Sequence, residues 1–267
     1  MPEERRIRLD VAYRGTNYRG WQRQEGYPTV QGEIEAALRR VIGESVFIRG
    51  SSRTDTGVHA LQQVAVLTTS AALPAERFAQ ALNANLPRDI RVLRSAEVSP
   101  DFDPIGDCVR KRYRYLISDV PVLSPFLTDA VWDYRIGPLD VETMHAAAQA
   151  FCGEHDFASF QTTGSPRRST VRTIFDISVR RRTMSLPFGL SGIHDDNMPQ
   201  IIVFEVEGSG FLYKMVRTIV GTLTAVGRGK QPVDGIAEVI AAKDRCAAGT
   251  TAPPEGLYLV SITFQDR

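Results

Sequence analysis

The order of strand-like and helical segments in the first part of the chain most constrains its fold. Alternating apolar residues predict strands over 7–13, 46–50, 62–68 and 90–98. Apolar residues at helical spacing predict a helix that Thr29 caps and that runs through Val41, and a second helix from Pro74 through Leu82. The resulting order, βαββαβ, is that of the ferredoxin-like unit.

The second part of the chain repeats this order with one additional helix. Strands are predicted over 109–118, 171–181, 200–207 and 257–264, and helices over 140–151, from about Phe211, and over 233–243. We therefore expect an α+β fold of two ferredoxin-like (βαββαβ-type) halves with mainly antiparallel sheets and a central cleft, a place that favours ligand binding. Pro100, Pro104 and Gly106 interrupt both periods, which predicts an N-terminal α/β domain of residues 1–105 and a C-terminal α/β domain of residues 106–267.

Composition restricts the class of protein more than its function. A hydrophobic content of 43% and a charged content of 24% are typical of a soluble globular protein. No apolar run approaches the roughly 18 residues of a membrane span, and the charged N-terminus does not resemble a signal peptide. Three cysteines, all far apart, predict a reducing and therefore cytoplasmic compartment. Neither metal-ligand spacing nor a nucleotide-binding glycine motif is found, so we expect no metal and no cofactor.

Positive charge is clustered although the net charge is only +1. Residues 110–115, Arg-Lys-Arg-Tyr-Arg-Tyr, place four cations and two aromatic rings together. Clustered cations indicate phosphate binding, and a solvated charged face is the alternative. In a strand, Lys111, Tyr113 and Tyr115 share one face. Tyr113 is then placed to stack on an extruded base, or else to pack half-buried against a helix.

Two segments place reactive side chains at the ends of predicted strands. Residues 52–62 hold Asp55 in a turn, where it either faces a ligand or merely bonds its own backbone. Residues 208–217 run from a strand into a helix, on which Lys214 and Arg217 are expected to share a neighbouring face. A cation near a helix start is suited to pair with a carboxylate or phosphate, and a solvated Arg217 is the alternative.

These segments resemble, in order, the motifs of a known family. Residues 53–60, Arg-Thr-Asp-Thr-Gly-Val-His-Ala, resemble the signature of the TruA family of tRNA pseudouridine synthases. Further motifs similar to those of this family are 18–24, 83–90, 111–115, 155–160, 211–221, 241–245 and 256–259. The resemblance thus covers essentially the whole chain.

The resemblance implies an enzyme that isomerises uridine to pseudouridine without a cofactor. Asp55 would be the catalytic nucleophile, Arg217 would pair with it, and Tyr113 would stack on the flipped base and accept the final proton. An Asp with a reference pKa of about 3.9 is ionised at neutral pH and needs no activating base. Further residues are expected to bind the substrate: Arg53, His59, Lys111, Arg112 and Lys214. The substrate would be the anticodon arm of tRNA, modified at three consecutive positions on its 3′ side, and family members are homodimers.

Three segments depart from the family pattern. Ser52 stands where the family usually has Gly, residues 102–105 (Phe-Asp-Pro-Ile) replace its FxAR, and the predicted irregular insertion 183–199 is longer than usual. The acid at Asp103 argues against a phosphate contact there. Two alternatives to the isomerase are a catalytically silent RNA-binding module and a carboxylate-dependent nucleosidase. Intact Asp55, Tyr113 and Arg217 favour the isomerase over the silent module.

Overall fold

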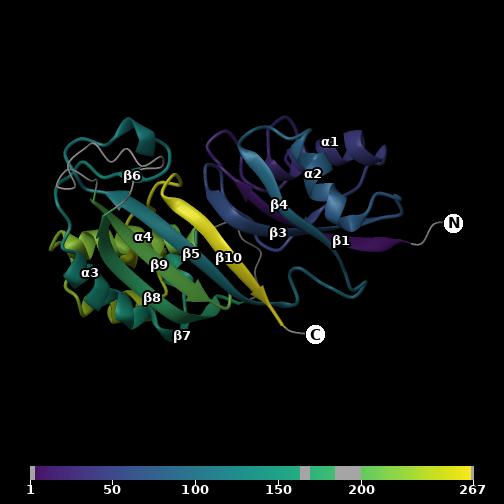
Figure 1. The fold of residues 1–267 in the computed structure, drawn as a ribbon. Helices are drawn as coiled ribbons and strands as arrows, with labels where there is room; N and C mark the ends of the chain where they lie inside the picture. The colour runs from purple at the N-terminus through teal and green to yellow at the C-terminus, as the bar shows by residue number, and fades with distance from the viewer. Residues whose placement is uncertain (1–3, 163–168, 184–199, 266–267) are drawn as a thin grey trace. The chain divides into compact units, whose positions relative to one another are not determined.

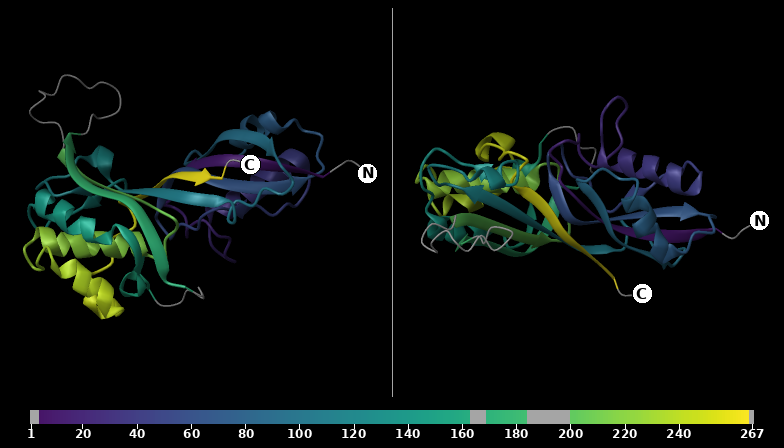
Figure 2. Two further views of the ribbon diagram at one scale, coloured as in Figure 1. Left: turned by 90° about the horizontal axis from the view of Figure 1, so that it is seen from below. Right: turned by 45° about the horizontal axis from the view of Figure 1, so that its top comes forward.

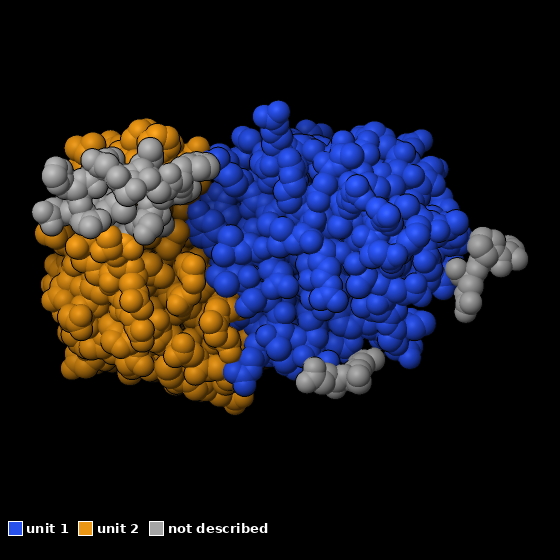
Figure 3. Space-filling model, viewed as in Figure 1, with its two compact units in different colours: residues 1–111, 258–267 blue, residues 112–257 orange. Residues whose placement is uncertain are grey.

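The chain folds into two compact units, each built from strands and a few helices. A computed structural model describes residues 4–162, 169–183 and 200–265. One unit contains residues 1–111 and 258–267, and the other contains residues 112–257 (Figure 3). The predicted α+β class is confirmed. The predicted insertion lies, beyond Thr183, outside the described residues.

The first unit contains part of a large, mostly antiparallel sheet (Figure 1). Its strands follow one another in the order β4 (Ile90–Val98), β1 (Arg5–Tyr13), β3 (His59–Thr69) and β10 (Leu257–Phe264), with β2 (Arg49–Gly50) beside β3. Strand β1 pairs antiparallel with β3 and β4, whereas β10 pairs parallel with β3. The last strand of the chain therefore joins the sheet built by the first residues.

Helix α1 (Val30–Ile42) shows how the sequence fixes an element. The Thr29 side chain accepts a hydrogen bond from the Gly32 amide at the start, as predicted. Gly43 ends the helix with a φ of 75°, a conformation that glycine adopts without strain. Helix α2 (Phe78–Asn83), after the 3₁₀ turn η1 (Ala75–Arg77), contacts β4, where Asn83 exchanges two 2.8 Å hydrogen bonds with the backbone of Val92.

The second unit has its own mostly antiparallel strands. Their order is β5 (Cys108–Ser118), β9 (Gln200–Gly208), β8 (Val171–Thr183) and β7 (Gly153–Asp156), and β6 (Trp132–Asp133) pairs parallel with β5. Figure 2 shows the helices α3 (Val141–Ala148), α4 (Met215–Gly227) and α5 (Gly235–Ala242) gathered on one face of these strands. Both β6 and β7 were missed because runs this short carry no readable alternation.

Helix α4 forms the centre of the second unit's core. Met215, Ile219 and Leu223 are completely buried, as the apolar stripe predicts. A Cβ atom added to Gly221 would lie 1.7 Å from the carbonyl oxygen of Thr250, so only glycine allows this approach. The helix is therefore held directly against the loop that precedes β10. No helix in the described parts of the chain is long and apolar enough to cross a membrane.

Candidate functional site

Asp55 lies in a turn between β2 and β3. The Val58 amide donates to the Asp55 carbonyl over 3.1 Å, which closes the turn. Asp55 is partly exposed and Arg53 is exposed, whereas Thr54 is 7% and His59 1% exposed. The turn therefore leaves Arg53 exposed and Asp55 partly exposed, and it is anchored by the buried Thr54 and His59.

The loop that follows β1 packs against this turn through backbone. Gly20 has a φ of 92°, and a Cβ atom on it would lie 2.5 Å from the carbonyl oxygen of Thr54. The amide of Trp21 donates to the same oxygen over 3.1 Å, and the amide of Gly57 donates to the Tyr18 carbonyl over 3.3 Å. The two motifs at 18–24 and 53–60 thus form one structural element. In the sequence, Gly20 is the residue that signals this close contact.

Buried side chains hold the same turn from beneath. The hydroxyls of Tyr13 and Thr54 share a buried hydrogen bond of 2.7 Å. The amide of Gly15 donates to Nδ1 of His59 over 3.0 Å, and a Cβ atom on Gly15 would lie 1.9 Å from the Val58 carbonyl oxygen. These contacts have no local signal in the sequence, because they join residues more than 40 positions apart.

Ser52, which replaces the usual glycine, is accommodated as a buried residue. Its amide donates to Oε1 of Gln63 over 3.2 Å, and Nε2 of Gln63 donates to the Ser52 carbonyl over 2.6 Å. The ammonium of Lys111, a predicted substrate-binding group, donates to the carbonyl of the preceding Ser51 over 2.8 Å. Lys111 therefore supports the segment that leads into the turn.

Asp103 lies in the segment 102–105, which differs from the family pattern, and its carboxylate stabilises the local structure. Its carboxylate accepts a hydrogen bond from the Ile105 amide over 2.9 Å and lies 3.5 Å from the guanidinium of Arg49. The backbone hydrogen bond from Ile105 is the main cause that lowers the pKa of Asp103. The acid thus caps a turn in the segment between β4 and β5.

The basic strand β5 carries two of its three arginines opposite acids of β9. Arg112 donates two hydrogen bonds, of 3.0 and 2.7 Å, to Glu207, and Arg114 does the same to Glu205. The hydrogen bond with Glu207 raises the pKa of Arg112. A phosphate bound here would compete with these carboxylates, so the positive charge of β5 is partly balanced within its own sheet.

The tyrosines of β5 share the opposite face, as alternation predicted. Tyr113 is 6% exposed, and its ring meets that of Phe211 edge to face at 5.1 Å. Tyr115 is completely buried and donates to the Pro253 carbonyl over 2.7 Å. Tyr115 is therefore a core residue, whereas the role expected for Tyr113 stays a prediction.

Arg217 lies on the first turn of α4 and is half-buried. Its Nε donates to the Ala252 carbonyl over 2.7 Å, and the Ala252 amide donates back to the Arg217 carbonyl over 3.0 Å. Lys214 precedes the helix with a φ of 60°, and its ammonium lies 5.0 Å from the ring centre of Tyr213. The prediction that Lys214 and Arg217 share a helical face is therefore wrong, because the helix begins at Met215.

The loop that binds Arg217 is itself held by Arg245. The guanidinium of Arg245 donates to the carbonyls of Ala248 and Gly249 over 3.3 and 3.0 Å, and to the hydroxyl of Thr251 over 3.0 Å. These bonds give the motif at 241–245 a supporting role behind Arg217.

The predicted site residues fall into two groups. Asp55, Arg53, His59 and Lys111 lie in the first unit, and Arg112, Tyr113, Lys214 and Arg217 lie in the second. Within the described residues, no cluster of three or more His, Cys, Asp or Glu side chains is arranged to hold a metal ion. The meeting of Asp55 with Tyr113 and Arg217 stays a prediction.

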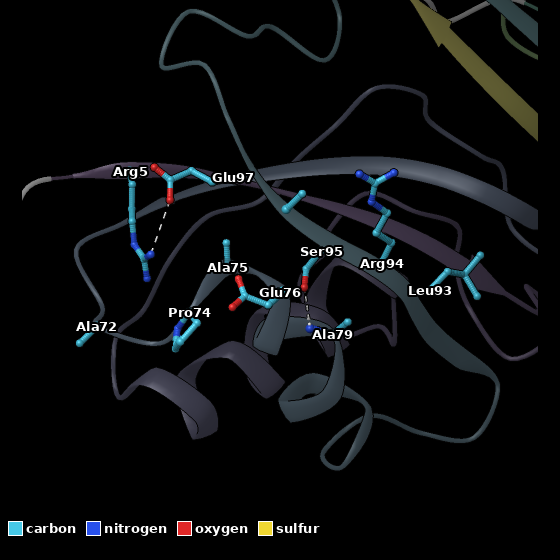
Figure 4. Close-up of a pocket in the computed structure, with 11 residues that line it drawn as sticks. Arg5, Ala72, Pro74, Ala75, Glu76, Ala79, Leu93, Arg94, Ser95 and Glu97 are labelled. Atoms are coloured by element: carbon cyan, nitrogen blue, oxygen red, sulfur yellow. Dashed lines mark hydrogen bonds and ion pairs between the residues drawn. The ribbon is translucent and has the colours of Figure 1, made fainter.

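A hollow lies beside β4 in the first unit. Figure 4 shows Arg5 turned toward Glu97, at 3.6 Å, along its rim. Arg5 also donates to the carbonyls of Ala71 and Leu73, and Ser95 is bonded to the Ala79 amide. Arg5, Glu97 and Ser95 at this hollow thus each have a partner within the first unit.

Sequence comparison identifies relatives over nearly the full chain. The profile of a family described as tRNA pseudouridine synthase matches residues 11–104 and 147–265. A protein named tRNA pseudouridine synthase A from Acetivibrio thermocellus is 44% identical, over 97% of this chain and 100% of its own length. Proteins of the same name from Ruminiclostridium cellulolyticum and Thermoanaerobacter sp. (strain X514) are 45% and 41% identical, with the same coverage of both chains.

Comparison with solved structures gives a remote likeness. A chain in the crystal structure of the archaeal box H/ACA sRNP Nop10-Cbf5 complex matches at 14% identity and a TM-score of 0.33, over 82% of this chain and 44% of that one.

Proposed function

Because the chain belongs to the tRNA pseudouridine synthase family and is an RNA uridine isomerase, we propose that Asp55 is its catalytic nucleophile. The observation that carries the proposal is the ordered turn around Asp55, which presents a partly exposed carboxylate beside the exposed Arg53. The carboxylate needs no neighbouring base, because a carboxylic acid of ordinary pKa is ionised at neutral pH.

The reaction breaks the bond between N1 of uracil and C1′ of ribose and forms a bond between C5 and C1′. The proton on C5 is lost and N1 gains one, so the isomerisation is redox-neutral and consumes no co-reactant. Attack of the Asp55 carboxylate on the ribose or on the uracil ring gives the same net result. In either case a covalent intermediate divides one difficult step into two easier ones.

We assign the next two roles to the second unit. Tyr113 stacks on the extruded uracil and receives the proton from C5, and Arg217 pairs with Asp55 and holds the nucleotide. Extruding a stacked base costs on the order of a few kcal/mol, which stacking on an aromatic ring offsets. The Ala252 carbonyl already orients the guanidinium of Arg217 through its Nε.

The RNA partner we propose is the anticodon arm of tRNA, at three consecutive positions on its 3′ side. Arg53, Lys111, Arg112 and Lys214 contact its backbone, with Arg112 exchanging Glu207 for phosphate. We further propose that the protein acts in the cytoplasm and that it is a homodimer. Light scattering tests the oligomeric state directly. We also propose that its two domains are ferredoxin-like halves.

The test uses unmodified tRNA incubated with the protein, followed by chemical derivatisation that maps pseudouridine. Pseudouridine in the anticodon arm is the expected product. Absence of any product in tRNA that the protein demonstrably binds would favour a silent RNA-binding module. Release of free uracil would instead indicate a nucleosidase.

A further inference from the structure

His59 is among the most enclosed polar side chains of the first unit. It is 1% exposed, and its ring lies against that of Tyr258 on β10, with the ring centres 4.7 Å apart and the planes inclined by 26°. On one edge of the ring, Nδ1 accepts the Gly15 amide over 3.0 Å. These contacts leave little room for a nucleotide to touch the imidazole.

The hydrogen bond from Gly15 fixes the form of the ring. A backbone amide can only donate, so Nδ1 must carry a lone pair, and the proton of the neutral imidazole resides on Nε2. The same Gly15 has no space for a side chain, since a Cβ atom would lie 1.9 Å from the Val58 carbonyl oxygen. Gly15 thus makes both contacts: its amide donates to the imidazole of His59, and its Cα lies close to the Val58 carbonyl.

This contact lies at the end of the turn that carries Asp55. His59 follows Val58, whose amide closes the turn on the Asp55 carbonyl. At the other side of the turn, the amide of Trp21 and the hydroxyl of Tyr13 bind Thr54. The loop after β1 therefore holds the turn immediately before and shortly after Asp55.

We propose that His59 is a positioning residue for Asp55 rather than a contact for the substrate. Its neutral Nδ1 locks the loop after β1 onto the catalytic turn, and this lock sets the direction of the carboxylate. The proposal rests on Asp55 being the nucleophile. A displacement of about 1 Å at a reacting group lowers a rate by as much as 100-fold, so loss of the lock should act on kcat.

Two variants of similar chemistry separate the possibilities. In His59→Asn the amide oxygen occupies the place of Nδ1, because both are one bond from Cγ. In His59→Gln the side chain is closer in volume to histidine, but its oxygen lies one bond farther out. We expect His59→Asn to keep a kcat at least about tenfold higher than that of His59→Gln, with the Kd for tRNA unchanged in both.

The outcome is decided by comparison within this pair. A kcat for His59→Gln that equals or exceeds that of His59→Asn would indicate a space-filling role and overturn the proposal. A raised Kd at normal kcat would indicate a substrate contact and also overturn it.

Hydrogen exchange of the Gly15 amide gives a readout that does not depend on activity. We expect protection in the wild type and in His59→Asn, and at least about tenfold faster exchange in His59→Gln. Equal exchange in all three would refute the lock. Asp55→Asn, measured in parallel, tests the proposed function separately, since its turnover reports on the nucleophile and the Gly15 amide reports on the lock.

Discussion

In the first unit the turn around Asp55 is fixed by close backbone contacts together with buried side chains, whereas in the second unit the guanidinium of Arg217 is fixed by one hydrogen bond to a loop. Gly15 and Gly20 approach the turn so closely that a Cβ atom on either would meet a carbonyl oxygen within 2.5 Å. Arg217 lies on a regular helix, and its guanidinium is directed by the carbonyl of Ala252. The position of Asp55 therefore depends on close packing around its turn, and that of Arg217 depends on one long side chain and the loop at Ala252.

The difference matches the chemistry proposed for each group. A nucleophile must be held to within a fraction of an ångström, and a short aspartate on a braced turn has little freedom. A cation that neutralises charge tolerates more movement. Substitutions should therefore be least tolerated at Asp55 and in the contacts of its turn, and more graded around Arg217.

The sharpest test of this comparison is Asp55→Asn. The amide keeps the size of the carboxylate but cannot act as a nucleophile, so we expect turnover to fall by more than about 1,000-fold. Binding of tRNA should stay within twofold, because the turn and Arg53 are unchanged. Single-turnover assays and filter binding measure the two quantities, and Asp234→Asn, at an exposed position directly before α5, is the matched control. Measurable turnover by the purified variant would remove Asp55 from its proposed role.

Arg217 provides the corresponding test in the second unit. We expect Arg217→Ala to lower kcat by about 100-fold, since one charge-stabilising donor is lost from the reaction site. Arg217→Lys should recover part of this loss, because it restores the charge without the donor to Ala252. A kcat for Arg217→Ala within a few-fold of the wild type would contradict the proposed pairing with Asp55.

Much of the frame on which these residues stand was predictable from periodicity. The cap at Thr29, the strand β1 and the apolar stripe of α4 follow from the spacing of side chains, and the structure confirms them. The start of α4 was not predictable, because Lys214 adopts a left-handed conformation that its residue type does not signal.

The support of the site was less accessible to sequence reasoning. The octet around Asp55 identifies the turn, but its partners Tyr13 and Gly15 lie more than 40 positions away and are selected only by the pairing of β1 with β3. The pairing of β10 with β3 likewise joins distant parts of the chain, so no local period reveals it.

Gly20 and Gly26 form a matched pair that tests the backbone contact of the first unit. Both have positive φ, 92° and 78°, but only Gly20 meets another segment, whereas a Cβ atom on Gly26 has open space. We expect Gly26→Ala to cost about 1 to 2 kcal/mol of folding free energy. Gly20→Ala must also displace the Thr54 carbonyl, for which we expect about 3 kcal/mol or more and a roughly tenfold lower kcat. Chemical denaturation measures the folding free energy and initial rates measure kcat. Equal costs for the two variants would show that the Thr54 carbonyl can move without a loss of stability.

The smallest effect we expect concerns an ion pair in the frame of the second unit. Burial would raise the pKa of Asp119, but hydrogen bonds from Arg181 and the Leu139 amide outweigh it, so its pKa is lowered from the ordinary value of 3.8. The carboxylate is 2% exposed and lies 2.7 Å from Arg181.

A lowered folded pKa means that the pair stabilises the protein above the unfolded pKa, and that this stability is lost as the pH falls through the folded pKa. At neutral pH we expect Asp119→Asn to cost about 2 kcal/mol, since the hydrogen bonds to a charged acceptor are weakened. Below pH 3.8 that cost should shrink, because the carboxyl of the unfolded wild-type protein is then protonated and folding must release this proton. Turnover at neutral pH should not change, since Asp119 supports the loop at Leu139 and not Arg217. If the cost of Asp119→Asn does not depend on pH, the stabilisation comes from packing rather than from the ion pair. If the variant loses turnover, Asp119 also supports the residues that take part in the reaction.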